Sequence, residues 1–164
     1  MSTSSPTRRI ITTRGEFLGV VRDAFAQAAD AGAGEIWICD ATFADWPLSE
    51  RAVIDDLTRW VDSRRRFTLF AREFDELARR HGRWTEWRRQ WAHAVHCRTN
   101  EELETAQFPT ICWVPGVISL RMLDPVGHRG LASHEAVDSV ACREAIDAIS
   151  QRSTEAFPVT MLGL

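Results

Sequence analysis

The sequence predicts an α/β fold, a single domain in which a mixed sheet with parallel βαβ units and a C-terminal hairpin is flanked by helices. Between residues 13 and 98, segments with apolar residues at helical spacing alternate with short apolar runs, as they do in βαβ units. A Pro-Gly pair at 115–116 joins two runs of β-forming residues, which indicates a hairpin. An amphipathic segment over 136–151 predicts the last helix.

Local signals define the first βαβ unit. Residues 13–16, Thr-Arg-Gly-Glu, have the form of a capping box and predict a helix that ends at about residue 31. Residues 35–39 form a short apolar run between a glycine and an aspartate, which is typical of a buried strand. A helix over about 47–61 and a strand over 66–71 follow, so the two strands are expected to be parallel with a right-handed crossover.

The same alternation continues toward the hairpin. A short helix over 73–80 and a tryptophan-rich helix over 84–92 lead to a third strand over 94–98. The hairpin is expected over 110–123, and a loop rich in glycine and proline over 124–130 follows it.

Three segments lie outside these elements. Residues 131–133 are either a short extended piece or the lead-in to the last helix. The Ser/Thr/Pro-rich segment 1–9 is predicted to be disordered or loosely attached, and the domain is placed at 10–164. The tail over 157–164 is apolar, so we expect it to dock on the body of the protein or on a second subunit.

Composition restricts the class of protein. No apolar run approaches the ~20 residues of a transmembrane helix, and the N-terminus lacks a signal-peptide core. We therefore expect a cytoplasmic protein with reduced cysteines and no membrane contact. All 20 residues counted as lysine plus arginine are arginine, which excludes Schiff-base and P-loop lysine chemistry. The cysteine and glycine spacings match neither a metal site nor a dinucleotide loop, so no metal and no cofactor are expected.

The stretch from His81 to Arg98 holds three of the seven tryptophans and three of the five histidines. Trp84, Trp87 and Trp91 are spaced i, i+3 and i+7, so a helix places them on one face, and we expect that face to pack in the core. Between residues 64 and 98, ten arginines outnumber four acidic residues, and such a segment attracts anions. The functional candidates are therefore the residues that flank the tryptophans.

Candidate binding groups also lie at the carboxyl ends of the predicted parallel strands. The predicted ligand-binding set, an anion clamp, consists of Asp40, Arg72, Arg83, Arg88, His93 and Arg98. The candidate catalytic residues are Asp40, His93 and His96, because a carboxylate can orient a histidine that acts as a base. Structural roles stay open: a histidine can bond a backbone group, and Asp40 can cap the helix that follows it.

The order of elements resembles one half of the phospholipase D-like fold, whose active members carry H-x-K-x4-D on the hairpin. When Pro115 and Gly116 are placed at the hairpin turn, the His, Lys and Asp of that motif fall on Phe108, Thr110 and Pro115. None of these three residues can replace the nucleophile, the phosphate-binding lysine or the orienting aspartate. The resemblance therefore implies a domain without phosphodiesterase activity.

Three shorter runs look like an uncharacterised bacterial domain family, a degenerate single half of the phospholipase D-like fold that is sometimes fused to acetyltransferase domains. The runs are Asp40 to Leu48 with its Trp-Pro-Leu ending, His81 to His93, and Thr160 to Leu164. This resemblance covers about residues 10–164 and implies a fold more than an activity.

These observations predict a non-catalytic domain that binds an anionic ligand or a protein partner. The alternatives are an enzyme with a rebuilt Asp/His site that acts on a phosphate-containing substrate, and a nucleic-acid-binding module. The isoelectric point of about 6.0 disfavours nucleic acid. The candidate partners are a second copy of the chain, an anionic small molecule and, by resemblance, acetyltransferase-type proteins.

Overall fold

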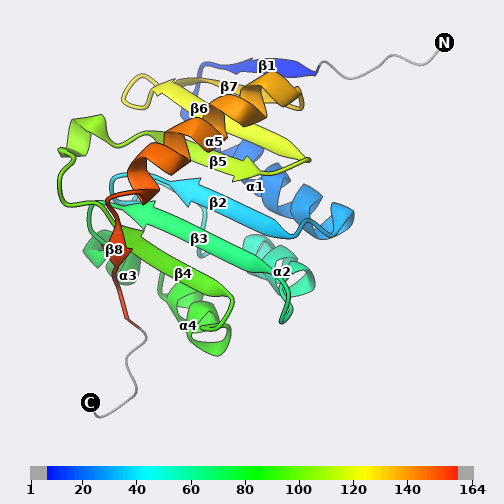
Figure 1. Cartoon of the computed structure of the whole chain (residues 1–164). Coiled ribbons are helices and arrows are strands. Elements are labelled where there is room, and N and C mark those ends of the chain that lie inside the picture. The colour runs from blue at the N-terminus through cyan, green and yellow to red at the C-terminus, as the bar shows by residue number, and fades with distance from the viewer. Residues whose placement is uncertain (1–6, 159–164) are drawn as a thin grey trace.

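The computed structural model describes residues 7–158, and within them eight strands form one mixed sheet in the order β1-β7-β6-β5-β2-β3-β4-β8 (Figure 1). The strands are β1 Arg8–Ile11, β2 Glu35–Cys39, β3 Arg66–Ala71, β4 Val95–Thr99, β5 Thr110–Val114, β6 Ile118–Asp124, β7 Arg129–Ser133 and β8 Thr154–Glu155. The helices are α1 Arg14–Ala31, α2 Arg51–Trp60, α3 Asp75–Arg80, α4 Gly82–Gln90 and α5 Ala136–Ser150, with a short 3-10 helix at Thr105–Gln107.

Helices cover both faces of the sheet, as the sequence predicts. Figure 1 shows α5 crossing one face over β5 and β6, while α1 to α4 lie on the other face. The larger hydrophobic core lies between the sheet and α1 to α4 and includes Val21, Leu57 and Trp84. A smaller core lies beneath α5 and includes Ile111 and Ile146. Within residues 7–158, no helix is long and apolar enough to span a bilayer.

The first helix begins where the capping box predicts. The side chain of Thr13 accepts a hydrogen bond from the backbone N–H of Glu16 at 3.1 Å, and the Thr13 hydroxyl donates to the Glu16 carboxylate at 3.1 Å. Gly32 ends the helix with a φ of 64°, a left-handed conformation that glycine adopts without strain. Both ends of α1 therefore follow from local sequence.

The predicted βαβ units are confirmed, because β2, β3 and β4 pair in parallel. Their register places Trp37, Thr68 and His96 in one row across the three strands. The predicted packing of the tryptophans is also confirmed: Trp84 and Trp87 are buried in the larger core, and Trp91 packs against it.

Two parts of the sheet differ from the sequence-based prediction. The loop predicted over 124–130 is wrong at both ends, because β6 extends to Asp124 and β7 begins at Arg129. The hairpin is therefore the start of a three-stranded antiparallel meander, and residues 131–133 belong to its last strand. Glycine and proline mark the turn correctly but do not show how closely the strands approach it.

The N-terminal boundary predicted at residue 10 is two residues late. Arg8 lies in β1, which pairs with β7, and its guanidinium makes two 2.9 Å hydrogen bonds to the Asp138 carboxylate on α5. A partner 130 residues away leaves no local signal. At the other end, β8 pairs with the last residues of β4, and Phe157 stacks on Phe74 with ring centroids 5.6 Å apart. The remainder of the predicted docking tail, 159–164, lies outside the described residues.

Candidate anion-binding site

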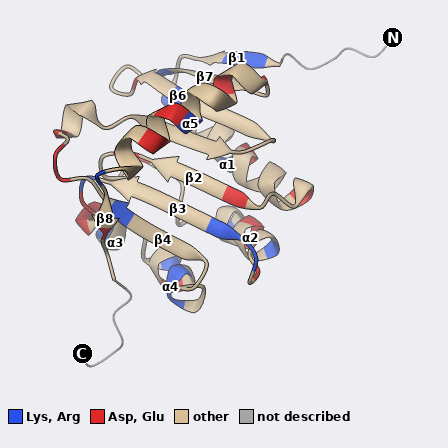
Figure 2. Ribbon diagram, viewed as in Figure 1, with Lys and Arg blue, Asp and Glu red and all other residues tan. Residues whose placement is uncertain are grey.

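A cleft of about 450 Å³ lies along strand β4, between helix α4 and strand β8. It gathers basic residues from the stretch that the sequence singles out, and Figure 2 shows basic positions on α4 and on β4 beside β8. Its other walls are mostly small and apolar. The lining residues are Arg88, Ala92, Val95, His96, Cys97, Arg98, Glu155, Ala156 and Pro158.

Arg88 is the buried cation of the cleft. Its neighbour Trp87 faces the core, and this places Arg88 at the border of that face, where only 6% of its surface is exposed. The carbon at the centre of its guanidinium lies 4.7 Å from the centroid of the Phe157 ring. Among residues 7–158, Nε of Arg88 has no hydrogen-bond partner, and no carboxylate lies within ion-pair distance of the guanidinium. Within that part of the chain, the charged group of Arg88 therefore contacts one aromatic ring and has no counter-ion.

Arg98 lines the same cleft and is held in a fixed orientation. Strand β4 directs its side chain toward the segment after α5, where Nε donates to the Ser153 hydroxyl at 2.8 Å and Nη2 donates to the Ser153 carbonyl at 2.9 Å. Both bonds use the Nε edge of the guanidinium. The Nη1 end is the part of the group that can bind a ligand.

His96 lies on β4 near both guanidiniums and is half-buried. Burial lowers the pKa of its imidazole, and the positive charges of Arg66, Arg98 and Arg88 lower it further, against the opposing effect of Glu155. Its ordinary pKa is already near 6.5. At neutral pH the ring is therefore uncharged and can donate one hydrogen bond while accepting another.

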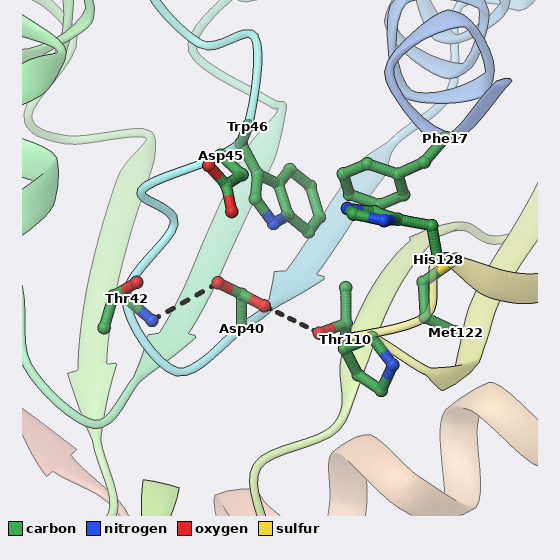
Figure 3. Close-up of a pocket in the computed structure, with 9 residues that line it drawn as sticks. Phe17, Asp40, Thr42, Asp45, Trp46, Thr110, Met122 and His128 are labelled. Carbon is green, nitrogen blue, oxygen red and sulfur yellow. Dashed lines mark hydrogen bonds between the residues drawn. The ribbon is translucent and has the colours of Figure 1, made fainter. Parts of the chain in front are cut away.

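Asp40, the predicted orienting carboxylate, lines a different and smaller cavity of about 80 Å³ (Figure 3). One of its oxygens accepts hydrogen bonds from the backbone N–H groups of Thr42 and Phe43, at 3.3 and 2.8 Å. The other accepts the Thr110 hydroxyl at 2.6 Å. These bonds hold the turn after β2, in which Phe43 adopts a φ of 60°. Both carboxylate oxygens of Asp40 thus accept hydrogen bonds from the chain itself, and β3 separates its strand from that of His96.

Three other members of the predicted set also lie away from the cleft. Arg72 bonds the Leu103 carbonyl at 3.2 Å, and Arg83 bonds the Ser49 carbonyl at 2.7 Å. His93 is exposed in the turn between α4 and β4. The structure therefore brings together Arg88 and Arg98 from the ligand-binding set and His96 from the catalytic candidates, and it does not bring the other residues to them.

Sequence reasoning did not identify Ser153 or Phe157 as part of this site. Ser153 orients Arg98, and Phe157 supports Arg88. Both lie beside β8, a strand of two residues that is too short to show a periodic pattern. The apolar character of the tail over 157–164 is the one sequence signal here, and of that tail the structure shows Phe157 packed against Phe74.

The positions assigned to the phospholipase D motif hold no catalytic group. Phe108 is buried in the smaller core, and the Thr110 hydroxyl is engaged by Asp40. Pro115 lies in the turn between β5 and β6. This side of the sheet has neither a nucleophile nor a phosphate-binding lysine at those three positions.

The sequence matches no family model and no curated protein. Solved structures do match in fold. TrmBL2, described as an archaeal chromatin protein with a novel mode of DNA binding, has a TM-score of 0.63 at 10% identity, over 95% of this chain and 57% of that one. Nuc, a phospholipase D family member from Salmonella typhimurium, has a TM-score of 0.56 at 11% identity, over 94% of this chain and 100% of that one.

The fold is phospholipase D-like. A phosphatidylserine synthase from Haemophilus influenzae Rd KW20 supports this assignment, with a TM-score of 0.51 at 13% identity over 93% of this chain and 39% of that one. The fold predicted from the sequence is confirmed. The degenerate motif and the smaller bacterial family stay predictions, since identities this low establish the fold alone.

Proposed function

We propose that this protein is a non-catalytic phospholipase D-like domain that binds an anionic ligand in the cleft along β4. The observation that carries the proposal is the buried guanidinium of Arg88, which lacks a counter-ion among the described residues. Arginine keeps its charge in folded proteins, and an unpaired ion in the interior costs several kcal/mol on the order of magnitude. A bound anion removes that cost.

The environment of Arg88 supports this proposal. Arg98 is already oriented by Ser153, so less conformational entropy is lost when it binds an anion. His96 adds a neutral donor in the same cleft. Guanidinium and imidazole groups are those that proteins use to hold phosphate, sulfate and carboxylate. Arg88 lies on the α4 face of the sheet, whereas His96 and Arg98 lie on the opposite face, because they alternate along β4 with Val95 and Cys97 of the larger core.

Absence of catalysis is proposed on two grounds. The assigned motif positions carry Phe108, Thr110 and Pro115, and Asp40 and His96 line different cavities. Glu155 and Cys97 line the same cleft as His96, but among the described residues neither is hydrogen-bonded to the imidazole, and burial raises the pKa of the Cys97 thiol to about 12, so it is not a thiolate nucleophile at neutral pH.

Nucleic acid is the second candidate ligand, because TrmBL2 is described as binding DNA. Binding to a polyanion requires several free cations on one surface. Here neighbouring arginines are already paired, as Arg80 is with Glu76 at 2.8 Å and Arg89 is with Glu86 at 3.5 Å. The cleft therefore favours a single anionic group.

Amide NMR spectra recorded during titration with phosphate, sulfate or citrate at constant ionic strength test the proposal. We expect the shifts to cluster at residues 88–98 and 153–157, and to disappear in Arg88→Met. The control is Arg89→Gln, an exposed neighbour on the same helix, which should respond like the wild type. Shifts scattered over the surface, or none, contradict anion binding at this cleft. Turnover of bis-p-nitrophenyl phosphate by the purified chain contradicts the absence of catalysis.

A further inference from the structure

We infer that the α4 side of the cleft binds a hydrophobic monocarboxylic acid, a single carboxylate carried by a small apolar body. This inference rests on the proposed anion site and names the class of its ligand. It follows from the place of the cleft at the edge of the sheet, from its net charge, from the donors that Arg88 offers and from the walls around that side chain.

The cleft lies at the edge of the sheet and differs in character between the two faces. Strand β8 pairs with only the last two residues of β4. Val95 and Cys97 point toward α4, because both belong to the larger core, whereas His96 and Arg98 point to the opposite face. Arg88 reaches the cleft from α4 itself. On the α4 face, Arg88 is therefore the charged residue that lines the cleft.

The net charge of the cleft matches a monoanion. Two arginines and one glutamate line it, which gives a sum of +1. Arg98 and Glu155 are direct partners in the β4–β8 pair, so their side chains share a face and their opposite charges offset each other. A carboxylate compensates the remaining charge of Arg88. A phosphomonoester carries about −1.5 to −2 at neutral pH and brings excess negative charge into a largely buried site.

Arg88 presents the end of its guanidinium to a ligand. Its exposed fraction is 6%, and its Nε is enclosed without a hydrogen-bond partner among residues 7–158. A ligand in the cleft therefore meets the two terminal nitrogens. These nitrogens form a fork that matches the two oxygens of a carboxylate through two parallel hydrogen bonds. A phosphate or a sulfonate has a further oxygen, which faces the apolar walls without a donor.

The walls beside Arg88 suit an apolar body. Ala92, Val95, Cys97 and Pro158 line the cleft, and burial raises the pKa of the Cys97 thiol to about 12, so this residue stays uncharged. The volume of about 450 Å³ lies within the range of roughly 300–1,000 Å³ found for small-molecule sites. An acidic side chain of a partner protein brings a polar backbone with it. A small organic acid instead covers these walls with carbon atoms.

Calorimetric titration of the full chain with four probes tests the ligand class. Benzoate carries a carboxylate and an apolar body, acetate the carboxylate alone, benzyl alcohol the body alone, and phenyl phosphate a phosphate on the same ring. We expect benzoate to bind about tenfold or more tightly than each of the others, which corresponds to about 1.4 kcal/mol. Phenyl phosphate should still bind at Arg88, at higher concentration.

The possible outcomes separate this inference from the proposed function. If phenyl phosphate binds as tightly as benzoate or more tightly, the selection of a monocarboxylate is overturned and the anion site remains. If acetate matches benzoate, the apolar body is overturned. If none of the anions binds to the folded wild-type chain, the proposed function fails as well.

Two substitutions and a control relate these affinities to the geometry. Arg88→Lys keeps the charge but removes the fork, so benzoate should bind about tenfold more weakly; an unchanged affinity would contradict binding through the fork. Glu155→Gln raises the net charge of the lining residues from +1 to +2, so the affinity for phenyl phosphate should rise relative to benzoate. An unchanged ratio would contradict the charge match. Glu155 is exposed, so this variant keeps the test valid should Arg88→Lys fold poorly. Arg89→Gln, at an exposed position of the same helix, should bind every probe as the wild type does.

Discussion

Replacing Arg88 by methionine should make the ligand-free protein more stable. The substitution removes a guanidinium that is 6% exposed and has no counter-ion among residues 7–158, and it keeps an unbranched side chain of similar length. Removing an unpaired buried charge recovers several kcal/mol on the order of magnitude, and losing the contact with Phe157 costs up to about 2 kcal/mol. We expect a net gain of about 1–3 kcal/mol in the free energy of unfolding, or roughly 2–4 °C in Tm per kcal/mol.

Adding phenyl phosphate should reverse the order of stability of the wild type and Arg88→Met. A ligand present at about a hundredfold excess over its Kd adds about 2.7 kcal/mol to the free energy of unfolding of the protein that binds it. The wild type should gain this increment with phenyl phosphate, and Arg88→Met should gain none. Urea unfolding followed by tryptophan fluorescence measures both quantities, because Trp60 and Trp84 are fully buried in the native state.

One result of the urea unfolding experiment would refute the view that Arg88 is an unsatisfied charge. If Arg88→Met lowers the free energy of unfolding in the absence of any anion by about 1 kcal/mol or more, Arg88 contributes to the fold and is not an unsatisfied charge awaiting a ligand. The exposed control Arg89→Gln should change the free energy of unfolding by less than about 0.5 kcal/mol with and without phosphate. A comparable shift in this control would mean that loss of any positive charge on α4 is sufficient.

Three further predictions concern other parts of the chain. Asp40→Ala should lower the free energy of unfolding by about 1.5–3 kcal/mol, because the carboxylate accepts hydrogen bonds from its own turn and from Thr110. The same variant should bind phosphate with unchanged affinity in calorimetry. A loss of affinity would contradict a purely structural role for Asp40. Arg66→Ala should raise the pKa of His96 in an NMR titration, since a positive charge that lowers it is removed; an unchanged pKa would refute that cause. Because folding lowers this pKa, the His96 contribution to stability should be lost as pH falls below the ordinary value near 6.5. Thr13→Ala should cost about 1 kcal/mol in urea unfolding through loss of the N-cap of α1, and an unaltered midpoint would show that the cap contributes nothing.

Elements with their own local signals were predictable from the sequence. The capping box at Thr13 starts α1, and the apolar runs at 35–39 and 66–71 match β2 and β3 residue for residue. Strands β1 and β8 were not predictable. The pair Thr154–Glu155 shows no alternation, and Arg8 is held by Asp138, which lies far away in the sequence. Both strands form by pairing with segments that lie far away in the sequence, so no short stretch of residues around either strand predicts it.

The candidate site was partly predictable for the same reason. The skewed composition of the stretch from His81 to Arg98 identified Arg88, His96 and Arg98. The carboxyl ends of strands drew attention to Asp40, but its own loop and Thr110 occupy that side chain. Sequence shows which residues carry suitable chemistry. The packing around each one decides whether its polar groups are already occupied.

The short pairing of β8 with β4 affects how the protein responds to proteolysis. It covers the open edge of β4 through only Arg98 and Thr99, supplemented by the Ala156 N–H that donates to the Cys97 carbonyl at 3.0 Å. Proteolytic cleavage in the exposed turn after α5 would release this strand together with Ser153 and the aromatic ring beneath Arg88. The uncovered edge would then present free backbone groups to other chains, which is the usual route to edge-to-edge aggregation. A nick at one peptide bond would both dismantle the cleft and turn the sheet into a template for self-association.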